Sequence, residues 1–199
     1  MKKEHFDRIS HERSLAIDAA KRLQRSRDVV SSKEAWRDLL NHIQRVHNYL
    51  NAAAKGSNAE VTWVQTQTNI RKNDELLQYA HQARHADEHG LEEVVQPQFT
   101  GYLIPPWNSG VNINSVMHSP DGYLVVDAVD DNGNQVDPLE IVALNYVRIV
   151  PVTNRAVPYA VPTSHLGQPV DVNNIAIIAR QLARHIDNTV NAAAQFIEP

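Results

Sequence analysis

The sequence predicts an α+β protein: an up-and-down bundle of about four long helices, with a small antiparallel β segment inserted before the last helix. Three features of the 199-residue chain support this. Apolar residues recur at helical spacing before residue 98, strand-forming residues and turn sequences follow it, and a second helical stripe closes the chain. We therefore expect residues 1–98 and 171–199 to form the bundle and residues 99–170 to form a β-rich insertion.

Two helices are expected in the first third of the chain. The first spans residues 9–28, where apolar residues recur at helical spacing. The second begins at Ser31, because Ser31 and Glu34 have the spacing of a capping box. Gly56 suits the left-handed position that follows a helix end. The second helix has a continuous apolar stripe made of Trp36, Leu39, Leu40, Ile43, Val46 and Leu50.

The remaining helices are less regular in sequence. A third helical segment runs from about residue 59 to residue 89, and we expect a break near Thr66–Asn69, where Thr and Asn side chains compete for backbone hydrogen bonds. Asp171 or Asn173 caps the last helix. Its apolar face is too long for the β segment to cover, so we expect it to pack with the other helices.

The segment between residues 99 and 170 is rich in strand-forming residues and turn sequences. Asp121-Gly122 and Asn132-Gly133 supply the positive φ that tight hairpins need. The prolines from Pro151 to Pro169 predict an extended, strand-poor path back to the last helix. Strands are expected at residues 99–104, 111–117, 123–129 and 141–152.

Composition excludes several classes of protein. The chain has no cysteine, which rules out disulfides, thiolate metal sites and a cysteine nucleophile. No stretch approaches the roughly 20 apolar residues that span a bilayer, so no membrane association is expected. The first residues lack the apolar core of a secretory signal, and we expect a cytoplasmic protein.

Charge is unevenly distributed along the chain. Residues 1–60 contain twelve Lys/Arg and eight Asp/Glu, whereas residues 99–199 contain four and nine. A basic segment of this kind can face an anionic partner such as RNA. The plainer interpretation is that these cations solvate a helix face.

The run Gln82–Gly90 resembles the signature of the HEPN family, in which an Arg and a polar residue precede a His by a few positions. Arg84, His85 and His89 carry the resemblance. It implies an RNA-binding or RNA-cleaving helical domain that uses no metal or cofactor, and a homodimer that brings two motifs into one cleft. A toxin–antitoxin or defence system is the setting that the family suggests. Asp87 and Glu88 are candidate substrate-binding residues.

Geometry separates this motif from two others with the same spacing. Arg37–His42 and Arg180–His185 lie inside strong helical stripes, where five residues turn the side chains about 140° apart. Arg84–His89 ends at Gly90, where the helix can unwind and His89 can approach Arg84. A histidine that titrates near neutrality and a fixed guanidinium suit cleavage of RNA by its own 2′-hydroxyl.

Three alternatives remain open. His81, His85 and His89 recur every fourth residue and can place imidazoles on a divalent metal, which would make this a metal-binding bundle. The β insertion can instead bind a protein partner, antitoxin-like or other, through its acidic surface. The plainest interpretation is a solvated helix end on which Arg84 pairs with Asp87 or Glu88.

Overall fold

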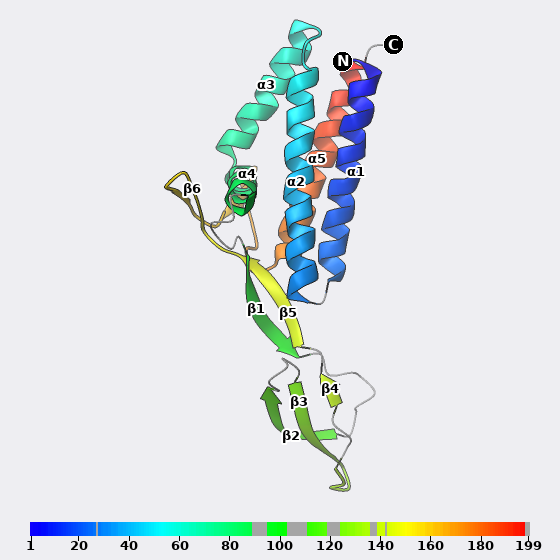
Figure 1. The fold of residues 1–199 in the computed structure, drawn as a ribbon, viewed down its shortest axis with the longest axis vertical. Helices are drawn as coiled ribbons and strands as arrows, with labels where there is room; N and C mark the ends of the chain where they lie inside the picture. The colour runs from blue at the N-terminus through cyan, green and yellow to red at the C-terminus, as the bar shows by residue number, and fades with distance from the viewer. Residues whose placement is uncertain are drawn as a thin grey trace. The chain divides into compact units, whose positions relative to one another are not determined.

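The structure is a computed structural model, and it describes residues 1–26, 28–88, 95–102, 111–118, 124–135, 139–141 and 143–197. The chain divides into two compact units. The helical unit comprises Met1–Pro97 and Val147–Pro199, and the β unit comprises Gln98–Tyr146. The predicted α+β class is confirmed (Figure 1). The described helices are α1 (Lys3–Arg25), α2 (Val29–Ala53), α3 (Asn58–Asn73), α4 (Glu75–Glu88) and α5 (Ile175–Ala193), followed by a 3₁₀ turn at Ala194–Phe196.

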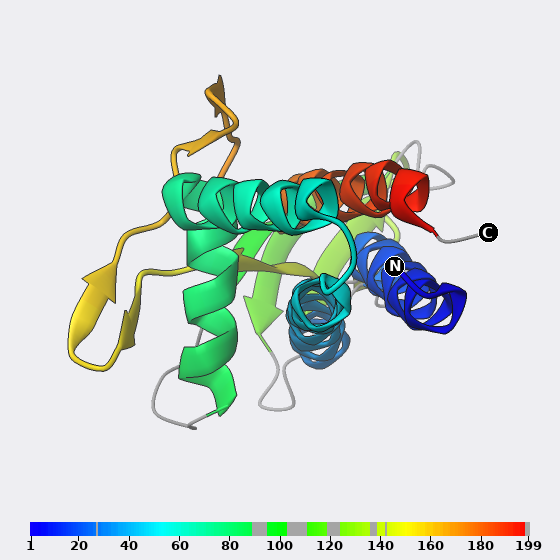
Figure 2. The same cartoon turned by 90° about the horizontal axis from the view of Figure 1, so that it is seen from above.

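Helices α1, α2 and α5 run side by side and form the centre of the helical unit (Figures 1 and 2). The predicted apolar stripes face this centre, and Leu39, Val46, Ile178 and Ile186 have no exposed surface. Burying one such side chain contributes about 1.5–3 kcal/mol, so the stripes hold the bundle together. Helix α1 starts at Lys3, earlier than predicted. None of the described helices is long and apolar enough to cross a bilayer.

The start and end of α2 differ from the prediction. Asp28 is its N-cap, because its Oδ1 accepts a hydrogen bond from the backbone N–H of Ser31 at 2.8 Å. The predicted capping box of Ser31 and Glu34 is therefore wrong: the carboxylate one turn earlier already accepts that bond. The helix ends at Ala53, and Gly56 is not among the described residues with a positive φ.

The third helical segment is broken, but at Asp74 rather than at Thr66–Asn69. Thr66 lies within continuous α3, where its hydroxyl donates to the carbonyl of Thr62 at 3.0 Å. Asp74 has an extended backbone, and its carboxylate accepts the N–H of Leu77 at 2.9 Å, which caps α4. The chain therefore turns sharply between α3 and α4 (Figure 2).

Residues 147–170, which were predicted to lie in the β insertion, belong to the helical unit. The path from Pro151 to Pro169, predicted as strand-poor, includes two short hairpins. Both hairpins contact α4. The backbone N–H of Thr163 donates to Glu75 at 2.8 Å, and the hydroxyl of Tyr79 donates to the carbonyl of Val150 at 2.7 Å. The hairpin strands are β6 (Val152–Asn154), β7 (Val157–Tyr159), β8 (Ser164–His165) and β9 (Gln168–Pro169).

The β unit contains an antiparallel sheet in the order β2-β3-β4. The predicted turn at Asn132-Gly133 is confirmed, with Gly133 at φ +82° and Asp130 accepting the N–H of Asn134 at 2.8 Å. The predicted turn at Asp121-Gly122 lies outside the described residues. The strands are β1 (Val95–Tyr102), β2 (Val111–His118), β3 (Leu124–Asp130), β4 (Leu139–Ile141) and β5 (Ala143–Ile149), and β1 pairs with β5.

Candidate functional site

Helix α4 carries the motif residues Arg84 and His85, which point in different directions. Consecutive residues on a helix are about 100° apart around its axis, so the two side chains contact different parts of the structure. Arg84 is half-buried against α2, where its Nε donates to Oδ1 of Asn41 at 3.3 Å. The ring of His85 meets the ring of His81 edge to face, with centroids 4.6 Å apart.

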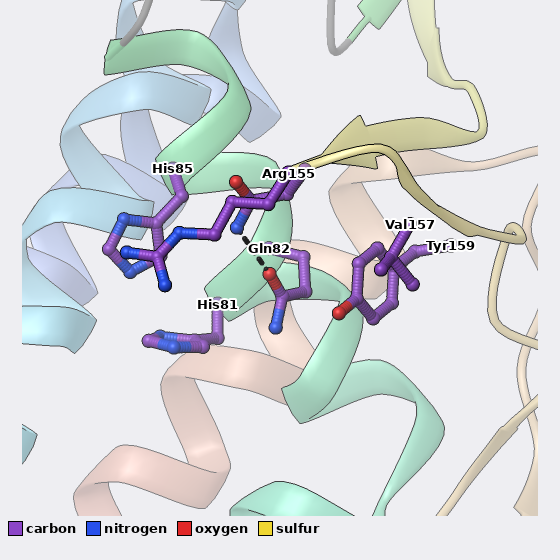
Figure 3. Close-up of a pocket in the computed structure, with 7 residues that line it drawn as sticks. His81, Gln82, His85, Arg155, Val157 and Tyr159 are labelled. Atoms are coloured by element: carbon purple, nitrogen blue, oxygen red, sulfur yellow. Dashed lines mark hydrogen bonds between the residues drawn. The ribbon is translucent and has the colours of Figure 1, made fainter.

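His85 and His81 line an open pocket of about 290 Å³ on the helical unit (Figure 3). One wall is α4, and the other is the β6–β7 hairpin. The two walls are joined by a hydrogen bond of 2.7 Å from the side-chain amide of Asn154 to that of Gln82. The lining residues are His81, Gln82, His85, Asn154, Arg155, Val157 and Tyr159.

The hairpin holds Arg155 over the pocket with a strained turn. Arg155 and Ala156 form the two-residue turn between β6 and β7, with φ of 51° and 63°. A turn with both φ values positive favours Asn and Gly, and side chains with a Cβ adopt it at a cost of about 1–2 kcal/mol. Such strain persists where the surroundings impose it and is frequent at functional sites. Figure 3 shows the Arg155 side chain extending toward His85.

The charge in the pocket is positive. Among its described lining residues there is no Asp or Glu. No hydrogen bond or ion pair joins the guanidinium of Arg155 to another described residue. A guanidinium without a counter-ion, beside histidine, amide and phenol groups, fits an anion with several oxygen atoms, such as a phosphate.

His81 is neutral at physiological pH. Burial is the main cause that lowers its pKa to about 4, and the charge of Arg71 adds to the effect. Its Nδ1 lies 2.7 Å from Oε1 of Gln44, which also accepts from Arg71 at 3.2 Å. Nδ1 lies farther from Arg71 itself, at 3.4 Å, so we assign the proton to Nδ1 and the hydrogen bond to Gln44. Nε2 then carries the lone pair and is the proton acceptor of the ring.

The remaining predicted site residues are only partly described. Asp87 and Glu88 lie in the last turn of α4, but their side chains are outside the described part of the chain. His89 and Gly90 also lie outside it. The predicted approach of His89 to Arg84 therefore stays a prediction.

The two competing pairs of Arg and His behave as predicted. Arg37 and His42 lie within continuous α2, and Arg180 and His185 lie within continuous α5. His42 instead contacts α1, with its Nδ1 2.6 Å from Oε2 of Glu12. Neither pair can converge on one ligand.

The metal alternative is tested only in part. Among the described residues, no three His, Asp or Glu side chains are arranged to hold a metal ion. His81 and His85 lie close together, but the third predicted ligand, His89, is outside the described residues. The charges of Arg71 and Arg84 already disfavour the protonated form of His81 and would oppose a bound cation as well.

The polar groups that lie behind the pocket were not predicted from the sequence. His47 on α2 is 4 % exposed, and burial, then Arg71 and His185, lowers its pKa to about 3. Burial, with the nearby His165, likewise lowers the pKa of His185 to about 4. Both histidines lie within helices whose apolar stripes the sequence predicts. Arg155 gave no signal, since its turn contains neither Asn nor Gly.

Comparison with known proteins identifies no relative of this chain. No family model, curated protein or solved structure matches the chain.

Proposed function

We propose that the chain is a HEPN-like RNA-binding domain that cleaves RNA without a metal, at the motif on α4 that includes Arg84 and His85. One observation carries the proposal. His85, the second residue of the Arg84–His89 motif, lines a pocket that also holds Arg155, whose guanidinium pairs with no described residue, and that has no described carboxylate in its lining. A phosphodiester is the ligand class that suits this set of donors.

The chemistry requires a proton acceptor, a proton donor and a fixed cation. The 2′-oxygen attacks phosphorus, the bond to the 5′-oxygen breaks, and a 2′,3′-cyclic phosphate forms. The 2′-hydroxyl proton passes to one neutral imidazole, and the 5′-oxygen takes a proton from a second, protonated one. We assign these two roles to His85 and His89, because the lowered pKa of His81 makes that ring a weak base. Arg155, which lines the pocket, stabilises the charge that develops on the phosphate oxygens. The family resemblance assigns the same role to Arg84.

Charge distribution supports RNA at the helical unit rather than at the β unit. The β unit contains six Asp/Glu and no Lys or Arg, whereas the rest of the chain contains seventeen and nineteen. Phosphate binding requires cations, so the β unit repels RNA and the helical unit can attract it.

The test is cleavage of single-stranded and structured RNA in EDTA by the full chain and by single variants. We expect Arg84→Ala, His85→Ala, His89→Ala and Arg155→Ala to lose about 10²-fold or more in rate. Arg8→Ala is the matched control, because Arg8 is an exposed cation that pairs only with Glu4 among the described residues. Cleavage that survives both Arg84→Ala and His89→Ala would sink the assignment.

The family resemblance also implies a homodimer that joins two motifs, and this is part of the proposal. Sedimentation of the full chain at several concentrations measures its mass directly. Mixing Arg84→Ala with His89→Ala protomers then tests whether the cleft is shared, because a shared cleft restores part of the activity in mixed dimers. An active monomer would contradict the shared cleft.

The β unit favours a second candidate function, the binding of a basic protein partner, antitoxin-like or other. Its lack of any Lys or Arg supports this. Asp131 in its turn is exposed, whereas Asp130 already accepts hydrogen bonds from Asn132 and Asn134. Deleting residues 99–145 should abolish capture of the partner while leaving RNA binding intact. Unchanged capture would count against this function.

A further inference from the structure

Helices α1 and α5 leave a groove of about 380 Å³ on the surface of the helical unit, away from the pocket on α4. Its floor is apolar and made of small side chains: Ala20 and Ala183 are 3 % and 8 % exposed, and Ile17 is half-buried. The rim is polar and exposed. The lining residues are Ile17, Ala20, Lys21 and Gln24 from α1, and Arg180, Ala183, Arg184 and Asp187 from α5.

The spacing of the lining residues is that of a surface groove into which another helix can pack. On each helix they fall at positions i, i+3, i+4 and i+7, which is a single face. Two such faces side by side make the groove into which the ridge of a third helix packs. The alanines at Ala20 and Ala183 allow that helix to approach closely.

The rim carries two arginines that no described carboxylate neutralises. Arg180 and Arg184 stand one turn apart on α5, and neither makes a hydrogen bond or an ion pair with another described residue. Asp187, the acid in the groove, is engaged by Arg13 at 3.7 Å. Lys21 makes an exposed contact of 3.4 Å with Asp18, a pair that contributes little in water. The groove therefore presents net positive charge beside an apolar floor.

We infer that this groove binds an acidic amphipathic helix of a partner protein. The apolar stripe of that helix covers Ile17, Ala20 and Ala183, and its flanking carboxylates pair with Arg180 and Arg184. This combination is a recurrent mode of helix recognition.

Two other occupants fit less well. RNA would satisfy the arginines, but it would leave the apolar floor facing a charged backbone. A second copy of the chain offers no matching helix among the described residues, because the exposed large apolar side chains there are Val30, Tyr49, Val157 and Leu166. Val30 and Tyr49, the two on a helix, lie 19 positions apart on α2 and form no stripe.

A displayed library of helices about 21 residues long tests the inference. In each heptad of these helices, positions a and d are fixed as Leu and Ala, and positions e and g vary among Glu, Gln and Lys. Selection on the full-length protein should enrich Glu at e and g. The selected peptides should bind R180E/R184E at least about tenfold more weakly, which corresponds to about 1.4 kcal/mol. Binding to R8E, a charge reversal elsewhere on α1, should not change.

The reciprocal exchange separates charge pairing from a folding defect. R180E/R184E should regain affinity for the same peptides with Lys in place of Glu, which a misfolded protein would not do. No enrichment of Glu, or binding that is indifferent to R180E/R184E, would overturn the inference. So would an RNA oligonucleotide that loses affinity for R180E/R184E while no peptide binds, since that result assigns the groove to nucleic acid.

Discussion

The carboxylate of Asp74, at the break between α3 and α4, lies 2.9 Å from Nδ1 of His165, a residue 91 positions later in the chain. Asp74 also accepts the backbone N–H of Leu77, which starts α4, and that of Leu166, which follows His165. One side chain thus caps the helix that carries the motif and fastens the returning chain to it. Because β6 and β7 belong to the same returning segment, Asp74 helps to fix both walls of the pocket.

Replacing Asp74 with alanine should destabilise the protein and loosen the pocket. Burial alone would raise the pKa of Asp74, but its hydrogen bonds from Leu166, His165 and Leu77 outweigh burial and lower the pKa, so the group is an anion with strong partners. We expect Asp74→Ala to lower the free energy of unfolding by about 2 kcal/mol. Asp74→Asn, which keeps an acceptor oxygen, should lose less. Urea unfolding at pH 7 measures both, and equal losses would contradict the assigned role.

The strained turn predicts a gain of stability from a glycine. Ala156 has a φ of 63°, which glycine adopts without a Cβ clash. Ala156→Gly should raise the free energy of unfolding by about 1 kcal/mol and leave Arg155 in place. Denaturant unfolding and RNA affinity should be measured together. A loss of stability would mean that the turn is not strained.

Arg155 should be needed for anion binding and dispensable for folding. Its guanidinium makes no hydrogen bond or ion pair with the described residues, so Arg155→Ala should change the free energy of unfolding by less than about 0.5 kcal/mol. Affinity for a short RNA should fall about tenfold or more, and the salt dependence of binding should weaken with the loss of one phosphate contact. Lys72→Ala, an exposed cation at the end of α3, is the control. Equal losses of RNA affinity from both variants would show that RNA binds through general surface charge and not through Arg155 in the pocket.

The parts of the fold that the sequence predicted are those set by local periodicity. The stripes from Trp36 to Leu50 and from Ile175 to Val190 specify α2 and α5 without reference to the rest of the chain. The break at Asp74 was misplaced because Asp74 has partners about 90 residues away in addition to Leu77, whereas the hydroxyl of Thr66 is satisfied within α3.

Only one wall of the pocket carries a pattern that the sequence analysis singled out. The motif on α4 is a local pattern, so it can be recognised from the sequence alone. Its opposite wall depends on contacts such as the one between Gln82 and Asn154, which are 72 residues apart, and on a turn at Arg155-Ala156 that lacks turn-forming residues. Neither feature leaves a mark in the sequence.

Stability should fall in mild acid because of three histidines. The pKa values of His47, His81 and His185 are lowered in the folded protein to about 3, 4 and 4. Unfolded histidine takes up a proton near pH 6.5, so below that pH the unfolded state binds more protons. The free energy of unfolding should therefore be independent of these groups above about pH 7 and should decline from about pH 6.5 toward pH 4. One proton of difference amounts to roughly 1.4 kcal/mol per pH unit.

His47→Leu isolates the most buried contribution. Nε2 of His47 has no hydrogen-bond partner among the described residues, and the residue is 4 % exposed, so leucine should replace it at little cost near pH 7. The slope of the free energy of unfolding against pH reports how many more protons the unfolded state binds. In His47→Leu this number should fall by about one between pH 6 and pH 4.5. His5→Leu, at an exposed position near the start of α1, is the matched control. An unaltered slope in His47→Leu would show that His47 is protonated in the folded state.

Removing metals should leave both stability and RNA cleavage unchanged. Nδ1 of His81 is engaged by Gln44, and the positive charges of Arg71 and Arg84 lie near the ring, so a divalent cation between His81 and His85 would be opposed by charge. We expect elemental analysis of protein purified without a His-tag to give far less than one metal per chain. We also expect unfolding curves in EDTA and in added zinc to coincide. The competing outcome is equally definite. Near-stoichiometric metal that disappears in His85→Ala, with a site that weakens below about pH 6 as the imidazoles take up protons, would replace the Arg and His site with a metal centre.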